Sequence, residues 1–144
     1  MSEGSSSPSS PGSQPTSERR VVITGIGVVT PLACEVDRFW ERLLGGESGV
    51  GQITLLDTAK YKIHFAGEVK NFSLDGIVEP REVKRLDRFT QFAVHAANEA
   101  VRDSGVDFDS LDRLRCGVIL GSGIGGLNEI EDQIERMITK GPSR

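Results

Sequence analysis

A group of basic residues at helical spacing is the first feature that could support binding or chemistry. The residues occur at offsets that place them on one face of a helix, at about 100° per residue. The chain as a whole is acidic, with a net charge of -4, so such clustering indicates either a solvated helix face or a docking surface for an acidic macromolecule. In the first case Glu82 and Asp87 would be the local partners. The four residues are Arg81, Lys84, Arg85 and Arg88.

The glycine-rich segment 121–126 is the second such feature. It satisfies the pattern G-x-G-x-x-G between a predicted strand and a predicted helix, as in a dinucleotide site. There the glycines let a phosphate approach the backbone, and the helix N-terminus favours its charge. In dinucleotide-binding domains, however, the pattern follows the first strand, and an acidic residue ends a second strand about 20 positions later. Here the pattern comes late and is followed mainly by helix, which favours a structural turn or one lining a substrate channel over a small nucleotide-binding module.

Cysteine and histidine are sparse in this sequence. Cys34 and Cys116 are too few for a disulfide framework and lack metal-ligand spacing. We interpret each cysteine as a small buried apolar residue. His64 and His95 are isolated, so the sequence assigns neither a catalytic residue nor a metal ligand.

Two continuous apolar runs, residues 21–29 and 116–120, predict strands that are covered on both faces. Gly25 and Gly27 within the first run indicate close approach of another backbone. Apolar residues at helical spacing predict helices over 35–44, 80–104 and 127–138. A short strand at 65–69 and a helical turn at 109–112 complete the prediction.

This alternation of strands and helices is typical of the α/β class. Two strong strands make a poor sheet alone, so we expect these elements to belong to a larger layered fold. Residues 1–18 contain eight Ser, three Pro and two Gly, a composition that predicts a disordered extension. Folding is expected to begin at about Arg19.

Composition also excludes several classes of function. A modest net charge of -4 gives no electrostatic footprint for nucleic acid. No apolar stretch approaches the roughly 18 to 20 residues that would span a bilayer. Residues 1–18 lack the basic and apolar regions of a secretory signal, so a cytoplasmic location is the default expectation.

Several segments together resemble one family, the elongating beta-ketoacyl-acyl-carrier-protein synthases. The opening run, Arg19 to Pro31, is similar to the family's first strand, and Phe39 to Gly49 is similar to the helix and turn after it. Further similarity follows in the family's order and covers residues 19–144, whereas residues 1–18 match nothing in the family. The remaining segments are Phe65 to Val69, Arg85 to Phe92 and Gly121 to Leu127.

The resemblance implies a thiolase-like fold, an α-β-α-β-α layered sandwich built from two duplicated halves and working as a homodimer. Its chemistry is a decarboxylating Claisen condensation of an acyl thioester with malonyl-acyl-carrier protein, with no cofactor. A cysteine at a helix N-terminus takes the acyl chain, two histidines assist decarboxylation, and backbone N–H groups hold the oxyanion. In the family these residues lie downstream of the segment seen here, so we expect 19–144 to be part of the N-terminal domain without the nucleophile.

Two groups of residues can be carried over from the family. Arg81, Lys84 and Arg85 match positions that present basic residues to the acidic acyl carrier protein. Gly123 and Ile124 match the loop that reaches the acyl pocket near the dimer interface. A non-catalytic chain-length factor of polyketide synthesis, with the same fold, is the alternative within this family.

Overall fold

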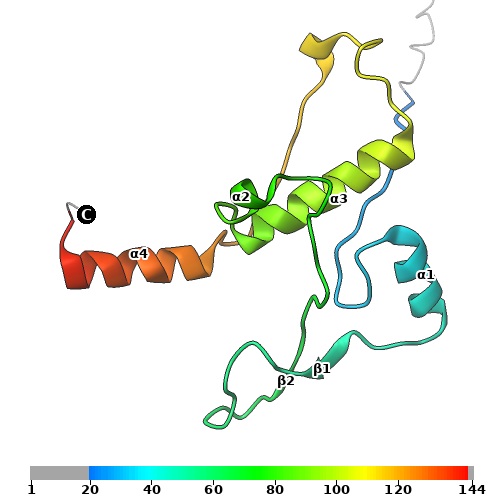
Figure 1. The fold of residues 1–144 in the computed structure, drawn as a ribbon. Coiled ribbons are helices and arrows are strands. Elements are labelled where there is room, and N and C mark those ends of the chain that lie inside the picture. Colours follow the sequence, from blue (N-terminus) through cyan, green and yellow to red (C-terminus); the bar gives the residue numbers. More distant parts are fainter. Residues whose placement is uncertain (1–19, 143–144) are drawn as a thin grey trace, which may run out of the picture.

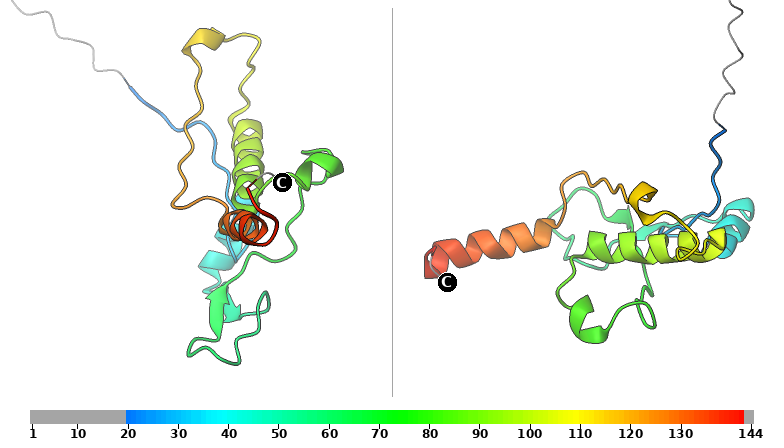
Figure 2. Two further views of the ribbon diagram at one scale, coloured as in Figure 1. Left: turned by 90° about the vertical axis from the view of Figure 1, so that its left-hand side faces the viewer. Right: turned by 90° about the horizontal axis from the view of Figure 1, so that it is seen from above.

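The computed structural model describes residues 20–142, and the predicted disorder of residues 1–18 lies outside this range. Four helices, two short strands and one 3₁₀ turn make up the described part (Figure 1). No two helices pack face to face within it, and α4 extends away from the other elements (Figure 1, and the right view of Figure 2). The elements are α1 (Val36–Leu44), β1 (Val50–Gln52), β2 (Phe65–Gly67), α2 (Pro80–Val83), α3 (Arg88–Ser104), the 3₁₀ turn (Arg113–Arg115) and α4 (Leu127–Lys140).

The segment 21–29 lies directly against α3. A Cβ atom added to Gly25 would lie 2.1 Å from the carbonyl oxygen of Ala100, and one added to Gly27 would lie 1.9 Å from that of Ala96. Glycine is therefore required at both positions, because an L side chain would overlap the helix backbone. This confirms the prediction that another backbone approaches these glycines.

The predicted strand 21–29 is wrong for the part of the chain that the structure describes, where this segment is extended but pairs with no strand. Side chains of α3 take up its backbone donors instead. The N–H of Ile26 donates to the carboxylate of Asp103 at 2.9 Å, and the N–H of Val28 donates to that of Glu99 at 2.9 Å. These carboxylates thus accept the hydrogen bonds that the carbonyl groups of a neighbouring strand would otherwise accept.

The predicted strand 116–120 is wrong in the same way, and its side chains are almost fully exposed. Val118 is 86% exposed and Ile119 is 98% exposed. Cys116 is also exposed, contrary to its interpretation as a buried residue, while Cys34 is half-buried. Leu74 is the only hydrophobic residue among 20–142 that is buried, so no element in this range covers the apolar run 116–120.

The two observed strands form a small antiparallel pair, in which Val50 lies opposite Gly67 and Gln52 lies opposite Phe65. The strand predicted at 65–69 is thus confirmed in a shorter form. β2 ends at Gly67, and the carboxylate of the next residue, Glu68, points toward the loop between β1 and β2. This carboxylate accepts hydrogen bonds from the N–H and the hydroxyl of Thr54 at 2.9 and 2.8 Å, and from the N–H of Leu55 at 3.1 Å.

The loop held by Glu68 is expected to loosen in acid. The backbone hydrogen bond from Thr54, followed by the bond from the Thr54 hydroxyl, lowers the pKa of the Glu68 carboxyl below its ordinary 4.5. A carboxyl whose pKa is lower in the folded state stabilises that state above its ordinary pKa and loses this effect as pH falls through the folded value.

Hydrogen exchange of the Thr54 and Leu55 amides across this acid range measures the effect. Protection factors, corrected for the intrinsic rate, should decline as pH falls below 4.5 in the wild-type chain. Glu68→Gln should show weaker protection and a flatter pH profile. An acid profile of the Gln variant identical to that of the wild type would contradict the assignment.

The single helix predicted over 80–104 is two helices, α2 and α3, separated by residues 84–87. The Gln91 side-chain amide donates to the carbonyl oxygens of Val83 at 3.3 Å and Leu86 at 2.8 Å. It thereby gives the Leu86 carbonyl a donor and adds a second donor to the Val83 carbonyl, which already accepts from the N–H of Leu86 at 3.1 Å, and both bonds stabilise the break. The predicted ends are confirmed: Pro80 begins α2, and Gly105 follows α3 with a left-handed φ of 61°.

The other predicted helices are confirmed with small shifts. α1 begins one residue later than expected, and α4 continues two residues further, to Lys140. The helical turn predicted at 109–112 instead lies at Arg113–Arg115, where the Asp112 carboxylate accepts a hydrogen bond from the N–H of Leu114 at 3.1 Å.

Candidate functional site

Three exposed cations gather on α2 and on the turn that follows it. We call Arg81, Lys84 and Arg85 the basic set. Arg81 lies on α2, and the other two lie in the break before α3. None of the three forms an ion pair with another residue in the range 20–142. Their charges are therefore available to a partner.

Arg88, the fourth cation of the sequence pattern, occupies a different environment. Its guanidinium carbon lies 4.8 Å from the ring centroids of both Phe72 and Phe92, a cation–π arrangement. It also donates a hydrogen bond to the carbonyl oxygen of Val69 at 3.2 Å. The break in the helix separates Arg88 from the other cations, so the sequence interpretation of four residues on one helical face is wrong for this residue.

The glycine-rich turn begins after the exposed segment 116–120 and ends at α4. Its Ser122 hydroxyl accepts a hydrogen bond from the N–H of Gly125 at 3.0 Å, and Gly125 has a φ of 88° that favours glycine. Gly123 and Ile124 are both exposed, with Ile124 at 70%. A cavity of about 240 Å³ touches the turn at Gly121 and Ser122 but not at Gly123 or Ile124.

The same turn contacts residues at the start of α3. The Asp87 carboxylate approaches Gly126, where an added Cβ would meet its Oδ2 at 2.4 Å, and a Cβ on Gly125 would lie 3.8 Å from the Phe89 ring. A negative charge therefore sits at the beginning of α4. Because a bound phosphate would face this carboxylate, the geometry disfavours the nucleotide-binding alternative.

Cys34 and His95 line one cavity of about 480 Å³, which the sequence did not predict. Burial raises the pKa of the Cys34 thiol, and the positive charge of Arg88 opposes that shift only in part. A raised pKa leaves the thiol protonated at neutral pH, the opposite of what a nucleophilic cysteine requires. Nδ1 of His95 is buried and has no hydrogen-bond partner within the described residues.

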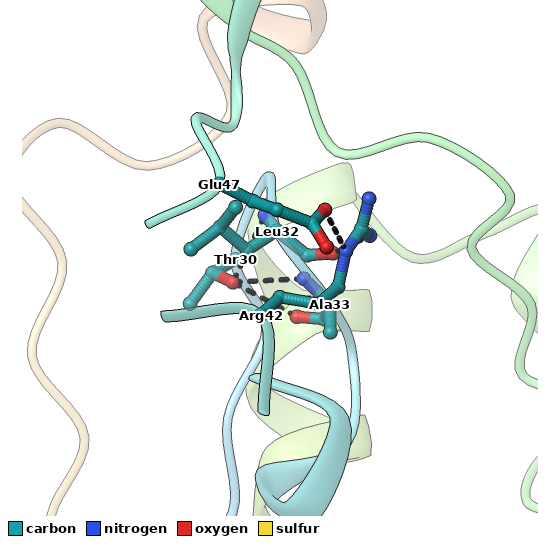
Figure 3. Close-up of polar contacts among 5 residues, drawn as sticks. All are labelled: Thr30, Leu32, Ala33, Arg42 and Glu47. Carbon is teal, nitrogen blue, oxygen red and sulfur yellow. Dashed lines mark hydrogen bonds and ion pairs between the residues drawn. The ribbon is translucent and has the colours of Figure 1, made fainter. Parts of the chain in front are cut away.

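Figure 3 shows the polar contacts of four residues that line this cavity, Thr30, Leu32, Ala33 and Arg42, together with Glu47. The Thr30 hydroxyl accepts hydrogen bonds from the N–H groups of Leu32 at 3.2 Å and Ala33 at 3.1 Å, closing a turn after segment 21–29. Arg42 of α1 donates to the Leu32 carbonyl and pairs with Glu47 at 2.7 Å. Since these bonds engage Arg42 within the fold, the cavity offers little for an anionic ligand.

The other cations around this cavity also have acidic neighbours. Arg38 lies 3.5 Å from Glu35, and Lys70 lies 4.0 Å from Glu68.

Within residues 20–142 no group of three or more His, Cys, Asp or Glu side chains is placed to hold a metal ion. In the same range no helix has the length and apolar character needed to cross a membrane.

Comparison with known proteins gives a consistent result. The sequence model described as the N-terminal domain of beta-ketoacyl synthase matches residues 18–142. The chain is 44% identical over 126 residues to 3-oxoacyl-[acyl-carrier-protein] synthase 2 of Staphylococcus aureus strain COL, which covers 88% of the chain. It is 40% identical over 127 residues to the protein of the same name from Synechocystis, which again covers 88% of the chain. The chain spans 30% of the length of each of these curated relatives.

Solved structures show a related fold. The ishigamide ketosynthase/chain length factor is similar with a TM-score of 0.69 and 30% identity, over 85% of this chain and 30% of that one. A type II polyketide ketosynthase in complex with its acyl-carrier protein is similar with a TM-score of 0.62 and 24% identity, over 83% and 32% of the two chains. The second likeness, at its low identity, concerns the fold alone. Because the family match covers the whole of the described range, the chain belongs to the beta-ketoacyl synthases.

Proposed function

We propose that this chain is the N-terminal part of a beta-ketoacyl-acyl-carrier-protein synthase of fatty-acid elongation. The complete enzyme condenses an acyl thioester with malonyl-acyl-carrier protein and releases carbon dioxide. The observation that carries the proposal is the 44% identity over 126 residues to a 3-oxoacyl-[acyl-carrier-protein] synthase. Residues 19–144 then contribute to the N-terminal domain, residues 1–18 precede it as an extension, and the enzyme is cytoplasmic.

The exposed apolar runs support a layered, thiolase-like sandwich for the complete protein. Val21 and Ile119 are 92% and 98% exposed, although their segments read as buried strands. Covering a large aliphatic side chain contributes roughly 1.5–3 kcal/mol each. We expect the rest of the protein, as a homodimer, to cover the apolar side chains of 21–29 and 116–120.

No residue of this chain is assigned to the chemical step. In the proposed enzyme the acyl-accepting cysteine and the two histidines lie further along the protein. The raised pKa of Cys34 supports this division, because a protonated thiol would be a poor acceptor of the acyl chain. The contribution of residues 20–142 is therefore binding and positioning.

The basic set is proposed to dock the acidic acyl carrier protein. Its three cations are exposed and form no ion pairs in the described part of an otherwise acidic chain. Charge-assisted contacts of this kind contribute about 1.5–3 kcal/mol each. Gly123 and Ile124 are proposed to border the acyl pocket, with Ile124 limiting the length of the chain that enters.

Charge reversal tests the docking proposal. In the complete synthase, Arg81→Glu combined with Lys84→Glu should raise KM for acyl-carrier substrates by about 10- to 100-fold, since each 1.4 kcal/mol is a factor of ten. Short thioester mimics without a carrier protein should keep their KM within about twofold, because they make no contact with the basic set.

A matched control is the double variant Lys60→Glu/Lys62→Glu, which makes the same change in net charge at exposed positions of the β1–β2 loop. This control should leave both KM values near those of the wild type. Equal increases for carrier-bound and carrier-free substrates, or an equal increase in the control, would argue against docking at the basic set.

The structural likeness to a ketosynthase/chain length factor favours a second candidate, a non-catalytic partner of the same fold. The two functions differ in the nucleophile. Purified complete protein that forms ketoacyl product from an acyl thioester and malonyl-acyl-carrier protein is a synthase. Protein that forms product only when a separate ketosynthase is added is a chain-length factor.

A further inference from the structure

Asp87 has an unusual position for a residue at a helix start. It is the N-cap of α3, where an Asp side chain normally accepts a hydrogen bond from its own helix, yet its carboxylate makes no such bond. The side chain instead approaches Gly126, the N-cap of α4. One short side chain therefore connects the starts of two helices.

The contact between Asp87 and the turn is close. A Cβ built on Gly126 would lie 2.4, 2.5 and 2.7 Å from Oδ2, Cγ and Oδ1 of Asp87, and no other residue supplies its three nearest atoms. Gly126 has a φ of −85°, so its backbone does not itself demand glycine. Glycine is needed here because the Asp87 carboxylate occupies the space. A negative charge at this end of α4 is also favourable to the helix dipole.

Phe89 reinforces the same connection two residues later. Its ring edge lies under Gly125, at 3.8 Å from a Cβ built there, and it lines the cavity that Gly121 and Ser122 share. Lys84 and Arg85 of the basic set precede Asp87 by three and two residues. The stretch 84–89 thus exposes two cations to solvent and contacts the glycine-rich turn through Asp87 and Phe89.

We infer that Asp87 is a positioning residue that fixes the turn 121–126 relative to the basic set, and thereby sets which acyl lengths the pocket beside Ile124 accepts. The inference rests on the proposed function, since it takes the acyl pocket and the carrier dock from it. Ile124 itself is exposed, and a Cβ built on Gly123 would meet no atom within 4 Å, so the positions of both residues depend on the anchored end of the turn. The anchor at Gly125 and Gly126 is the part of the turn that contacts another helix.

The experiment compares Asp87→Ala, Gly126→Ala and the double variant in the complete synthase. Pantetheine thioesters of one short and one long acyl chain serve as acyl donors, with malonyl-pantetheine as the second substrate, so the carrier dock is not involved. Each single variant should change the ratio of kcat/KM for long over short chains by about tenfold, because displacement of about 1 Å near a reacting group has effects of this size or larger. The methyl group that Gly126→Ala adds displaces the carboxylate, whereas Asp87→Ala removes it, so both break the same contact.

The double variant separates positioning from general damage. If the Asp87–Gly126 contact is what matters, the effects are not additive, and the double variant changes the ratio no more than either single variant. Asp87→Asn, which keeps the shape of the side chain and loses its charge, should retain a ratio closer to the wild type than Asp87→Ala does. Hydrogen exchange of residues 122–130 should rise in both single variants.

Two results would overturn the inference. The first is an unchanged long-to-short ratio in Asp87→Ala in an active, folded enzyme. The second is additive loss of activity toward both chain lengths in the double variant. Failure of the proposed function looks different, because the wild-type protein itself would then form no ketoacyl product from either thioester.

Discussion

Gly27→Ala is expected to lower the free energy of unfolding by about 3 kcal/mol or more. An added Cβ would lie 1.9 Å from the carbonyl oxygen of Ala96, 2.8 Å from its carbonyl carbon and 2.9 Å from the nitrogen of Ala100. All three atoms belong to the backbone of α3, so no side-chain rotation relieves the overlap. The segment must move away from the helix.

That movement would also stretch the hydrogen bonds beside the glycine. The N–H groups of Ile26 and Val28 donate to carboxylates of α3 on either side of Gly27 in the chain. The part-buried bond from Val28 to Glu99 contributes about 1.5–3 kcal/mol, and the exposed bond from Ile26 to Asp103 contributes about 1 kcal/mol. Steric overlap and lost bonds therefore act in the same direction.

Denaturant unfolding of the complete synthase measures the effect, with Gly51→Ala as the control. Gly51 lies in β1, and a Cβ added there would meet no atom within 4 Å. The control should differ from the wild type by less than about 0.5 kcal/mol, as for most exposed substitutions. If both variants unfold at the same denaturant concentration, the close approach of segment 21–29 to α3 is not part of the folded protein.

The helices could be predicted from the sequence because a helix is a local structure. Hydrogen bonds of α1 and α4 join residues four apart, and the spacing of their apolar residues reports the pattern directly. The strands differ, because a strand exists only through a partner. The runs 21–29 and 116–120 carry the composition of buried strands, but composition reports only a preference for burial and does not identify a pairing partner. In the described part of the chain neither has a neighbouring strand.

Two features of the candidate site, the helix break and the environment of Arg88, were predicted wrongly because each depends on side-chain contacts. The break between α2 and α3 depends on the Gln91 side chain bonding back to Val83 and Leu86, which helix propensity does not register. The sequence did offer one sign that a new helix begins after residue 87, because Asp favours the N-cap position. The break separates Arg88 from the basic set, and the cation–π contact that then holds Arg88 involves Phe72, a loop residue that helical spacing does not relate to it. The docking role of the basic set is a prediction from its charge pattern together with the family resemblance, and the role of Ile124 is a prediction from the resemblance alone.

Glu99 joins two segments that are far apart in the sequence. Its side chain is 8% exposed, and its two carboxylate oxygens accept hydrogen bonds from different backbone groups. Oε2 accepts from the N–H of Val28 at 2.9 Å, and Oε1 accepts from the N–H of Val36 at 2.8 Å. Val36 is the first residue of α1, whose own N-cap, Glu35, makes no side-chain capping bond. Glu99 therefore supplies from α3 the cap that α1 lacks, where the helix dipole also favours a negative charge.

Removing this carboxylate is the second change with a large expected effect. Glu99→Ala should lower the free energy of unfolding of the complete synthase by about 3–5 kcal/mol, because it leaves two part-buried N–H groups without acceptors. Glu99→Gln should fall between the wild type and the Ala variant, since its amide keeps one acceptor but turns an NH₂ group toward the other N–H. Denaturant unfolding gives the ranking, and hydrogen exchange at Val36 reports the cap directly.

Asp103→Ala is the matched comparison, because Asp103 lies one helical turn further along α3 and holds the same segment by a single exposed bond to Ile26. Its loss should be about 1 kcal/mol, since solvent can replace an exposed acceptor. Only the Glu99 variants should speed exchange at Val36, because only Glu99 reaches α1. Were Asp103→Ala as damaging as Glu99→Ala, with exchange at Val36 unchanged in both, the position of α1 would have to depend on its apolar face and not on this carboxylate.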